Sequence, residues 1–190
     1  MTSFSLDPRK TALVIIDLQQ GIVDRNAAPY SSAEVMKRSN QLARAFRAKG
    51  ATVIYVRVDM GNPLRLPVDT PPFAPGTPPP HASASELAPG AGFQTGDVLI
   101  TKRHWGGFAG TDLEKQLKTR GIDAVVLTGI STNIGVESTA RQGTGLGFAF
   151  VIVEDACAAA DAESHNYSFE KIFPRLARVR TTADILAAMA

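Results

Sequence analysis

Short runs of apolar, mostly β-branched residues recur along the chain, and this pattern constrains the fold more than any other feature. The clear runs lie at residues 12–16, 52–56, 97–100, 124–127 and 149–153, with a weaker one at 177–180. Continuous apolar runs of this length are typical of strands that are buried on both faces. We expect each run to be a strand of one sheet.

Helical signals separate most of these runs. Ser31–Glu34 and Thr111–Glu114 both fit the capping box, in which a hydroxyl residue is followed three positions later by glutamate. We expect Gly50 and Gly121 to end the two helices that begin there. Strands that alternate with helices form right-handed βαβ units. The sequence therefore predicts an α/β fold with a mainly parallel sheet that is covered on both sides.

The chain has the size of one domain. Its 190 residues, of which 44% are hydrophobic, suffice for one core of ordinary size. Residues 61–92 hold nine of the 12 prolines, a density that blocks helix and strand interiors. Because strand-like runs flank this segment, we interpret it as a long ordered loop that covers another part of the protein, rather than as a linker. We expect a single domain over residues 1–190.

The charge pattern excludes some classes of partner. The chain has 20 basic and 18 acidic residues, a net charge of +2, and the two signs are interspersed. The basic residues between 175 and 180 are too few for a nucleic-acid surface. No apolar run approaches a membrane span, and residues 1–10 lack the apolar core of a secretory signal. With one cysteine and no internal disulfide, we expect a cytoplasmic protein without nucleic-acid or membrane partners.

Polar residues stand where the predicted strands end. Asp17 follows the first strand, Lys102 follows the third, and a glycine-bearing turn at 129–135 follows the fourth. In a parallel sheet, ligands bind beyond the carboxyl ends of the strands. An acid, a base and the N-terminus of the helix expected to begin near Ile134 can therefore converge on one pocket, where backbone N–H groups favour an anionic ligand.

Three segments carry a resemblance to a known superfamily. They are LVIIDLQ at 13–19, KRHWGGFAGTDL at 102–113 and LTGISTNIGVESTA at 127–140. In this order and spacing they resemble the isochorismatase-like hydrolases, which include nicotinamidases and carbamoylsarcosine amidases. The resemblance extends from about residue 10 to residue 180, apart from the proline-rich loop. It implies a three-layer αβα domain with a six-stranded, mainly parallel, Rossmann-like sheet.

The resemblance also implies a site with one unusual position. The amidase members use an Asp, Lys and Cys triad, of which Asp17 and Lys102 match the first two. Gly135 stands where the nucleophilic cysteine would be, so a thioester cannot form there. True isochorismatases are similar in this respect, because they carry glycine at this position and cleave a vinyl ether with release of pyruvate. By this resemblance, Asp17 is expected to donate a proton and Lys102 to hold a substrate carboxylate.

The protonation of the acid poses a conflict. A nearby ammonium lowers the pKa of an aspartate, whereas a general acid needs a raised pKa. Either the charge of a bound substrate keeps Asp17 protonated, or the reaction differs from vinyl-ether hydrolysis.

The resemblance implies further positions that line the site. Gln19 matches a glutamine close to the pocket, and Trp105 and Phe108 match an aromatic wall, although aromatic residues there fit the core equally well. The peptide between Ile130 and Ser131 corresponds to a cis non-proline bond in many relatives. With Ile134, these residues are the expected substrate contacts.

The turn also departs from the isochorismatase pattern. Ser131, Thr132 and Asn133 stand where the isochorismatases carry an aromatic residue and a histidine, which makes a substrate other than isochorismate an open alternative. The turn is closer to the cysteine-bearing amidases, so Ser131, Thr132 or Cys157 remains a candidate substitute nucleophile for an amide hydrolase. A third alternative is a non-catalytic small-molecule binder or assembly subunit on the same fold.

We expect neither a metal nor a cofactor. The nicotinamidase metal site needs an Asp-x-His pair and a further histidine, and His81, His104 and His165 do not provide this pattern. Since related proteins are usually oligomers, the resemblance implies a homodimer or a higher homo-oligomer acting on a small molecule.

Overall fold

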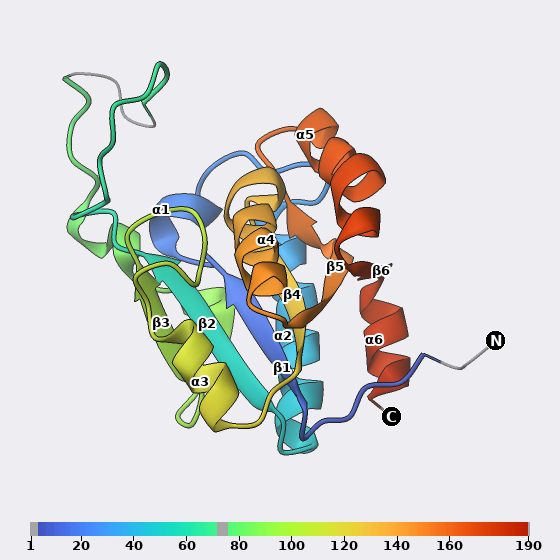
Figure 1. The fold of residues 1–190 in the computed structure, drawn as a ribbon. Coiled ribbons are helices and arrows are strands. Elements are labelled where there is room, and N and C mark those ends of the chain that lie inside the picture. Colours follow the sequence, from blue (N-terminus) through green and yellow to red (C-terminus); the bar gives the residue numbers. More distant parts are fainter. Residues whose placement is uncertain (1–3, 72–75, 190) are drawn as a thin grey trace.

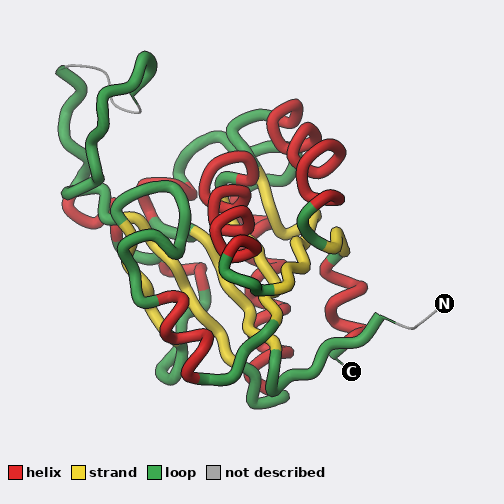
Figure 2. Tube along the Cα trace, in the orientation of Figure 1, coloured by secondary structure: helices red, strands yellow, loops and turns green. Residues whose placement is uncertain are grey.

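A six-stranded parallel sheet with helices on both faces forms the part of the chain that the computed structural model describes, residues 4–71 and 76–189 (Figures 1 and 2). The strands are β1 (Thr11–Ile16), β2 (Thr52–Val58), β3 (Val98–Lys102), β4 (Ala124–Ile130), β5 (Ala149–Ala158) and β6 (Arg178–Arg180). Their order is β3-β2-β1-β4-β5-β6, and every neighbouring pair is parallel. The predicted strands and the α/β fold class are confirmed.

Helices cover the two faces of this sheet. The α-helices are α1 (Gln20–Val23), α2 (Ser32–Ala48), α3 (Leu113–Thr119), α4 (Glu137–Gly145), α5 (Ala162–Tyr167) and α6 (Thr182–Ala188). Short 3-10 helices are η1 (Ala82–Ser85), η2 (Pro89–Ala91) and η5 (Phe173–Arg175). Short π-helices are η3 (Thr132–Val136) and η4 (Ser168–Ile172). In Figure 1, α2 and α6 lie behind the sheet, and α3, α4 and α5 lie in front of it.

Alternation along β1 explains the two cores. Leu13 and Ile15 pack in the cluster that contains residues of α2 and α6, whereas Val14 and Ile16 pack in the cluster that contains residues of α3 and α4. All four side chains are fully buried. A strand whose successive residues enter opposite cores reads as a continuous apolar run, as the sequence shows.

The two predicted capping boxes have different outcomes. Ser31 and Glu34 form the box at the start of α2, with each side chain bonded to the backbone of the other. The second prediction is wrong, because α3 begins after Asp112 and has no side-chain cap. The Thr111 hydroxyl instead donates to the Gly107 carbonyl at 2.6 Å, and the Glu114 carboxylate pairs with Lys118. The Thr111 hydroxyl oxygen accepts from the Leu113 N–H at 3.2 Å, rather than from the Glu114 N–H that a capping box at Thr111 requires.

The proline-rich segment forms an arm. Its first part projects from the domain, as Figure 1 shows, and exposes Leu64, Leu66 and Val68. Its return packs onto the domain through Ala84, and a cavity of about 190 Å³ lies between this return and α1. Residues 72–75 of the segment lie outside the described residues. Among the described helices, none is long and apolar enough to cross a membrane.

Candidate active site

The carboxyl ends of the strands bring the predicted acid and base together. Asp17 directly follows β1 and Lys102 ends β3, and the intervening strand is β2. The long lysine side chain spans β2, so that Lys102 Nζ lies 2.8 Å from Asp17 Oδ2. The side chain of Lys102 is only 2% exposed, and that of Asp17 is 7% exposed. The sequence prediction that these residues share one site agrees with this geometry.

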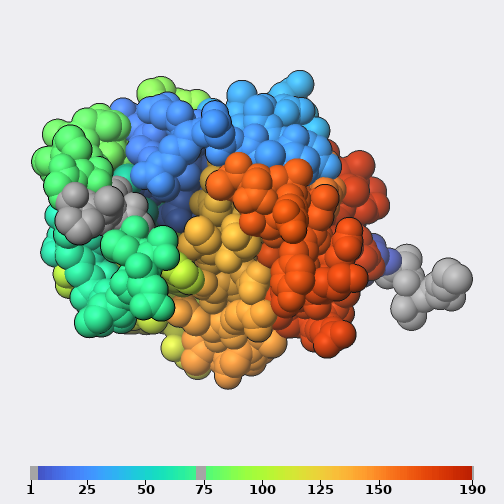
Figure 3. Space-filling model, turned by 90° about the horizontal axis from the view of Figure 1, so that it is seen from above, coloured from blue at the N-terminus to red at the C-terminus, as the bar shows by residue number. Residues whose placement is uncertain are grey.

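The ion pair lies at the end of the domain where the surface is hollowed. Viewed onto the carboxyl ends of the strands, the molecule has a central hollow that reaches the dark-blue N-terminal part of the chain (Figure 3). Blue residues that follow β1 and the yellow-orange start of α4 border this hollow. A separate cavity of about 380 Å³ lies beside Leu99 and Thr101 of the edge strand β3, and its lining includes neither member of the ion pair.

Local backbone geometry aims the Asp17 carboxyl group. Asp17 has a φ of 55°, which is uncommon outside glycine, and its N–H donates to the Val56 carbonyl at 2.8 Å. This conformation turns the chain sharply out of β1. Asp17 Oδ2 accepts from Lys102, whereas Asp17 Oδ1 is buried and has no hydrogen-bond partner among the described residues. A residue with an uncommon backbone conformation and one unbonded carboxyl oxygen is typical of a functional position.

Burial decides the protonation tendency of this carboxyl group. Removal from water raises the pKa of Asp17, and the charge and hydrogen bond of Lys102 lower it by less, so that the pKa lies above its ordinary value. The unpartnered Oδ1 is consistent with this direction, because no described donor there stabilises the ionised form. Desolvation therefore acts against the neighbouring ammonium, in the direction that a general acid needs.

Gly135 faces the ion pair from the turn after β4. A Cβ atom built on Gly135 would lie 3.1 Å from Asp17 Oδ2 and 3.5 Å from Lys102 Nζ. It would also lie 2.9 Å from Ile16 Cγ2, so a side chain here would require a small shift of the isoleucine. The position that the resemblance assigns to the nucleophile is thus directed at the acid and the base.

The backbone of the turn is unusual. The peptide bond between Ile130 and Ser131 is cis, as the resemblance implied. The Ser131 carbonyl then accepts from the N–H groups of Ile134 at 3.2 Å and Val136 at 3.1 Å, which gives the wide turn of a π-helix. Just before it, Gly129 has a φ of 125°, and a Cβ there would collide with the backbone of Ile16. Only glycine allows β4 to approach β1 this closely.

The predicted contacts in the turn differ in accessibility. Ile134 is 38% exposed, and Ser131 is partly exposed, with no described residue bonded to its hydroxyl. Ile130 is buried among core residues, so its side chain is not presented to a ligand.

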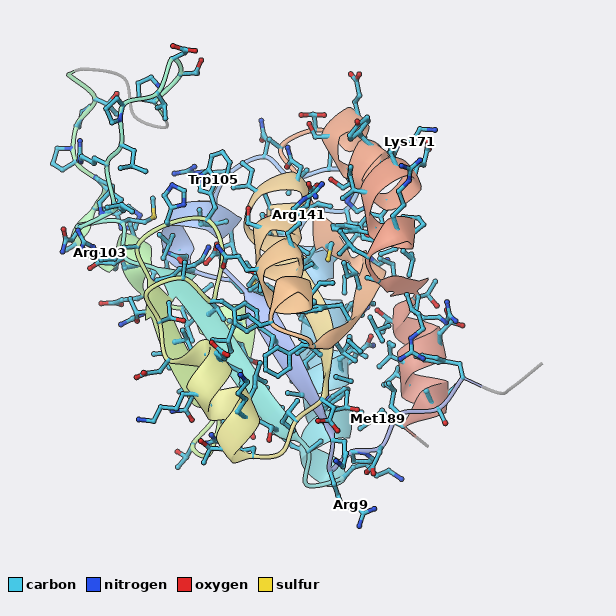
Figure 4. The ribbon with its side chains drawn as sticks, viewed as in Figure 1. Arg9, Arg103, Trp105, Arg141, Lys171 and Met189 are labelled. Atoms are coloured by element: carbon cyan, nitrogen blue, oxygen red, sulfur yellow. The ribbon has the colours of Figure 1, made fainter. Side chains whose placement is uncertain are left out.

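The two predicted aromatic contacts lie in different environments. Trp105 is 52% exposed and stacks on His104, with ring centroids 5.6 Å apart, and its carbonyl accepts from Lys102 Nζ at 2.6 Å. Figure 4 shows Trp105 at the end of the molecule where α4 begins. Phe108 instead is 6% exposed and stacks on Phe148 in the core. The core interpretation therefore holds for Phe108, because an apolar surface is available beneath the loop.

Gln19 has a different role from the substrate contact that the resemblance implied. Its side chain is fully buried, and its amide donates to the carbonyls of Val58 at 3.0 Å and Ala84 at 2.9 Å. Its Oε1 accepts from the Val58 N–H at 2.7 Å. Both donors are therefore used to join the end of β2 to the returning arm, and Gln19 positions backbone beside the site.

Two of the candidate substitute nucleophiles are inaccessible. Cys157 is fully buried on β5, and burial raises the pKa of its thiol, so that the reactive thiolate is disfavoured. Thr132 is fully buried, and its hydroxyl is 2.9 Å from His165 Nδ1. Sequence reasoning missed this contact, because His165 lies on α5 and no local motif links it to the turn.

No group of three or more His, Cys, Asp or Glu side chains among the described residues could hold a metal ion. The chemistry that the described site offers is that of a buried acid, an ammonium and an accessible turn.

The comparisons with known proteins agree with this fold and identify the family. The isochorismatase domain family matches residues 11–184. The isochorismatase family protein YecD of Escherichia coli O157:H7 is 50% identical, covering 97% of this chain and 98% of that protein. The ureidoacrylate amidohydrolase RutB of Stutzerimonas stutzeri is 32% identical over 81% of this chain and 72% of its own length. A solved isochorismatase family protein of Burkholderia thailandensis has a TM-score of 0.89 and 43% identity, with 97% of each chain covered. The chain belongs to the isochorismatase family.

Proposed function

We infer that the protein is a hydrolase of the branch that lacks the cysteine nucleophile, and that Asp17 is its general acid. The observation that carries this proposal is the buried Asp17–Lys102 pair. It combines a raised Asp17 pKa with a carboxyl oxygen that has no described partner. Gly135 faces both groups and supplies no side chain that could act as a nucleophile.

The favoured substrate class is a small anion with a vinyl-ether bond, of which isochorismate is an example. Lys102 donates one N–H to Asp17 and one to the Trp105 carbonyl, so its third N–H is available to a substrate carboxylate. The exposed side chains of Trp105 and Ile134 provide apolar contacts from the two segments that meet at the site. The Ser131 hydroxyl provides a polar one.

The reaction balances without a covalent enzyme intermediate. Protonated Asp17 transfers its proton to the terminal enol carbon, which leaves an aspartate and an oxocarbenium-like substrate. Water adds to this cation and returns a proton to Asp17, and the resulting hemiketal breaks its C–O bond to give a keto acid and an alcohol. The ammonium of Lys102 stabilises the aspartate that forms in the first step.

One observation favours a second function, an amide hydrolase. The Ser131 hydroxyl is partly exposed and bonds to no described residue, and RutB, a relative, is described as a ureidoacrylate amidohydrolase. In this alternative, Ser131 replaces the missing thiol as nucleophile. It predicts a covalent adduct on Ser131 with an electrophilic substrate analogue, visible as a mass shift that Ser131→Ala removes. A non-catalytic binder would give a bound ligand and neither product nor adduct.

The test is pyruvate release from isochorismate by the wild type, beside the isosteric variant Asp17→Asn and the variant Ser131→Ala, which removes the hydroxyl. The proposal predicts release by the wild type and by Ser131→Ala, and loss with Asp17→Asn. Equal release by the wild type and Asp17→Asn would refute the role of the acid. A covalent adduct on Ser131 would favour the amide hydrolase.

We further propose that the enzyme acts in the cytoplasm as a homodimer or higher oligomer and needs no metal. The described residues contain no cluster of metal ligands, and the exposed Leu64, Leu66 and Val68 of the arm offer an apolar contact to a second copy. Light scattering of the purified protein tests the oligomer. Activity that survives dialysis against a chelator supports metal independence, and activity that is lost and then restored by a metal contradicts it.

A further inference from the structure

A hydrogen-bonded chain of side chains, buried at Thr132 and His165, joins the turn after β4 to α5. The Thr132 hydroxyl is 2.9 Å from His165 Nδ1, and neither residue is exposed. His165 Nε2 lies 3.3 Å from Glu154 Oε1, and the Tyr30 hydroxyl donates to the same oxygen at 3.0 Å. These residues come from η3, α5, β5 and the segment before α2, so the network ties the turn to elements on the β5 side of the sheet.

The direction of each hydrogen bond follows from the carboxylate. The hydrogen bond from His165 is the largest cause that lowers the pKa of Glu154, which therefore favours its ionised form and acts only as an acceptor. The Nε2 atom of His165 therefore carries the proton of its hydrogen bond to Glu154, and Nδ1 faces the Thr132 hydroxyl.

This order of hydroxyl, imidazole and carboxylate resembles a hydrolase triad, but its burial excludes that role. Thr132 has no exposed surface, so no substrate atom can reach its hydroxyl. Thr132 also faces a different part of the protein from the site. Position 135 faces Asp17 and Lys102, whereas Thr132 faces His165 on α5.

A second bond makes the connection a two-point clamp. The Ser168 hydroxyl, fully buried at the start of η4, donates to Glu137 Oε2 at 2.8 Å. The segment α5–η4 therefore holds the segment η3–α4 at both Thr132 and Glu137. The residues beside the first point are Ser131 and, three positions on, Gly135.

We propose that His165 is a positioning residue, which holds Thr132 and thereby fixes the Ser131–Gly135 turn opposite Asp17 and Lys102. Glu154, which also accepts from Tyr30, holds the imidazole in the required orientation. The inference rests on the location of the proposed site, but not on the substrate or on the reaction.

The test compares Thr132→Val, which removes only the hydroxyl from a side chain of similar size, with Thr132→Ser, which retains it. Thr144→Val is the matched control, because the Thr144 hydroxyl on α4 bonds to the Ala140 carbonyl, away from His165. His165→Phe keeps a ring beside Phe169 and removes both nitrogens. Amide hydrogen exchange is measured for residues 132–136 and, as an internal reference, for β4.

A second readout reports on the site itself. In a Gly135→Cys background, the new thiol lies beside Asp17 and Lys102, and the pH dependence of its alkylation by iodoacetamide reports its distance from the ammonium. Neither readout needs a substrate, so failure of the proposed hydrolase function does not affect them.

We expect Thr132→Val and His165→Phe to speed exchange in the turn by roughly 10-fold, with β4 unchanged, and to shift the alkylation profile to higher pH. Thr132→Ser should restore both values, and Thr144→Val should leave both unchanged. Exchange that increases equally in β4 and the turn would show a general structural role and overturn the proposal. An alkylation profile identical to that of Thr144→Val would also overturn it. If His165→Phe does not fold, the two Thr132 variants decide the outcome.

Discussion

Lys102 Nζ lies 2.8 Å from Asp17 Oδ2, and both groups are almost completely removed from water. Isolated burial of either charge would be costly, so each group is kept in place by the other. The two members of the pair differ in their other hydrogen bonds. Lys102 has a second partner in the Trp105 carbonyl, whereas Asp17 Oδ1 has no partner among the described residues.

Removal of the lysine should destabilise the protein in a pH-dependent way. Lys102→Met leaves Asp17 buried without its cation, and we expect a loss of about 3 kcal/mol in the free energy of unfolding at pH 7. Since the folded-state pKa of Asp17 is raised further in this variant, the folded state binds the proton more tightly than the unfolded state. The loss should therefore shrink as the pH falls towards the ordinary carboxyl pKa. Urea unfolding at several pH values measures it, and a loss that grows on acidification would contradict the buried-acid interpretation.

The pH dependence of turnover should show that Asp17 acts as an acid. If protonated Asp17 donates the proton, kcat/KM for isochorismate falls about tenfold per pH unit above the pKa of Asp17. This pKa is raised by burial, so the fall should begin above the ordinary range of a carboxyl group. A rate that instead rises with pH through the same range would identify Asp17 as a general base. Ser131→Ala is the control, because it should leave the position of the fall unchanged.

A cysteine at position 135 should be reactive. In Gly135→Cys, the new side chain starts 3.5 Å from Lys102 Nζ, and the ammonium favours the thiolate. Because position 135 is buried and position 145 is exposed, the comparison is between pH profiles and not absolute rates: we expect the midpoint of alkylation to lie at lower pH in Gly135→Cys than in Gly145→Cys, whose Cβ would have no neighbour within 4 Å. The native Cys157 should not react in the folded protein, because it is fully buried. Equal midpoints for the two variants would show that position 135 does not sense the lysine. Gly135→Ala measures the steric cost of the contact with Ile16 separately.

The loss of Gln19 should affect stability through the backbone that it holds. Gln19→Ala leaves a buried N–H and two carbonyls without the bonds that the amide makes. We expect the free energy of unfolding to fall by about 2–4 kcal/mol, measured in urea. Gln94→Ala, at an exposed position, is the control and should change it little. An equally small change for Gln19→Ala would contradict the positioning role.

The strands and one helix start could be predicted because their signals are local. The apolar run at 12–16 enters two cores, and the box at Ser31–Glu34 lies within four consecutive residues. The second box failed because α3 begins after Asp112, so that the Thr111 hydroxyl oxygen accepts from the Leu113 N–H and not from the Glu114 N–H.

In the candidate site, too, the features with local sequence signals could be predicted and those that depend on distant residues could not. Asp17 and Lys102 follow from the rule that parallel strands end at one edge of a sheet. The buried states of Phe108 and Gln19, and the pairing of Thr132 with His165, depend on residues far apart in the sequence and were not predictable from local patterns. The direction of the Asp17 pKa likewise depends on burial, which required the three-dimensional arrangement.

The most direct measurement is the titration of the Asp17 carboxyl group by NMR, with 13C-labelled aspartate and with Asp17→Asn to assign the resonance. We predict that this carboxyl group titrates above the ordinary aspartate pKa of 3.8, because burial outweighs the effect of Lys102. A resonance of Asp17 that titrates below 3.8 would show that the ion pair dominates and would contradict its role as the general acid.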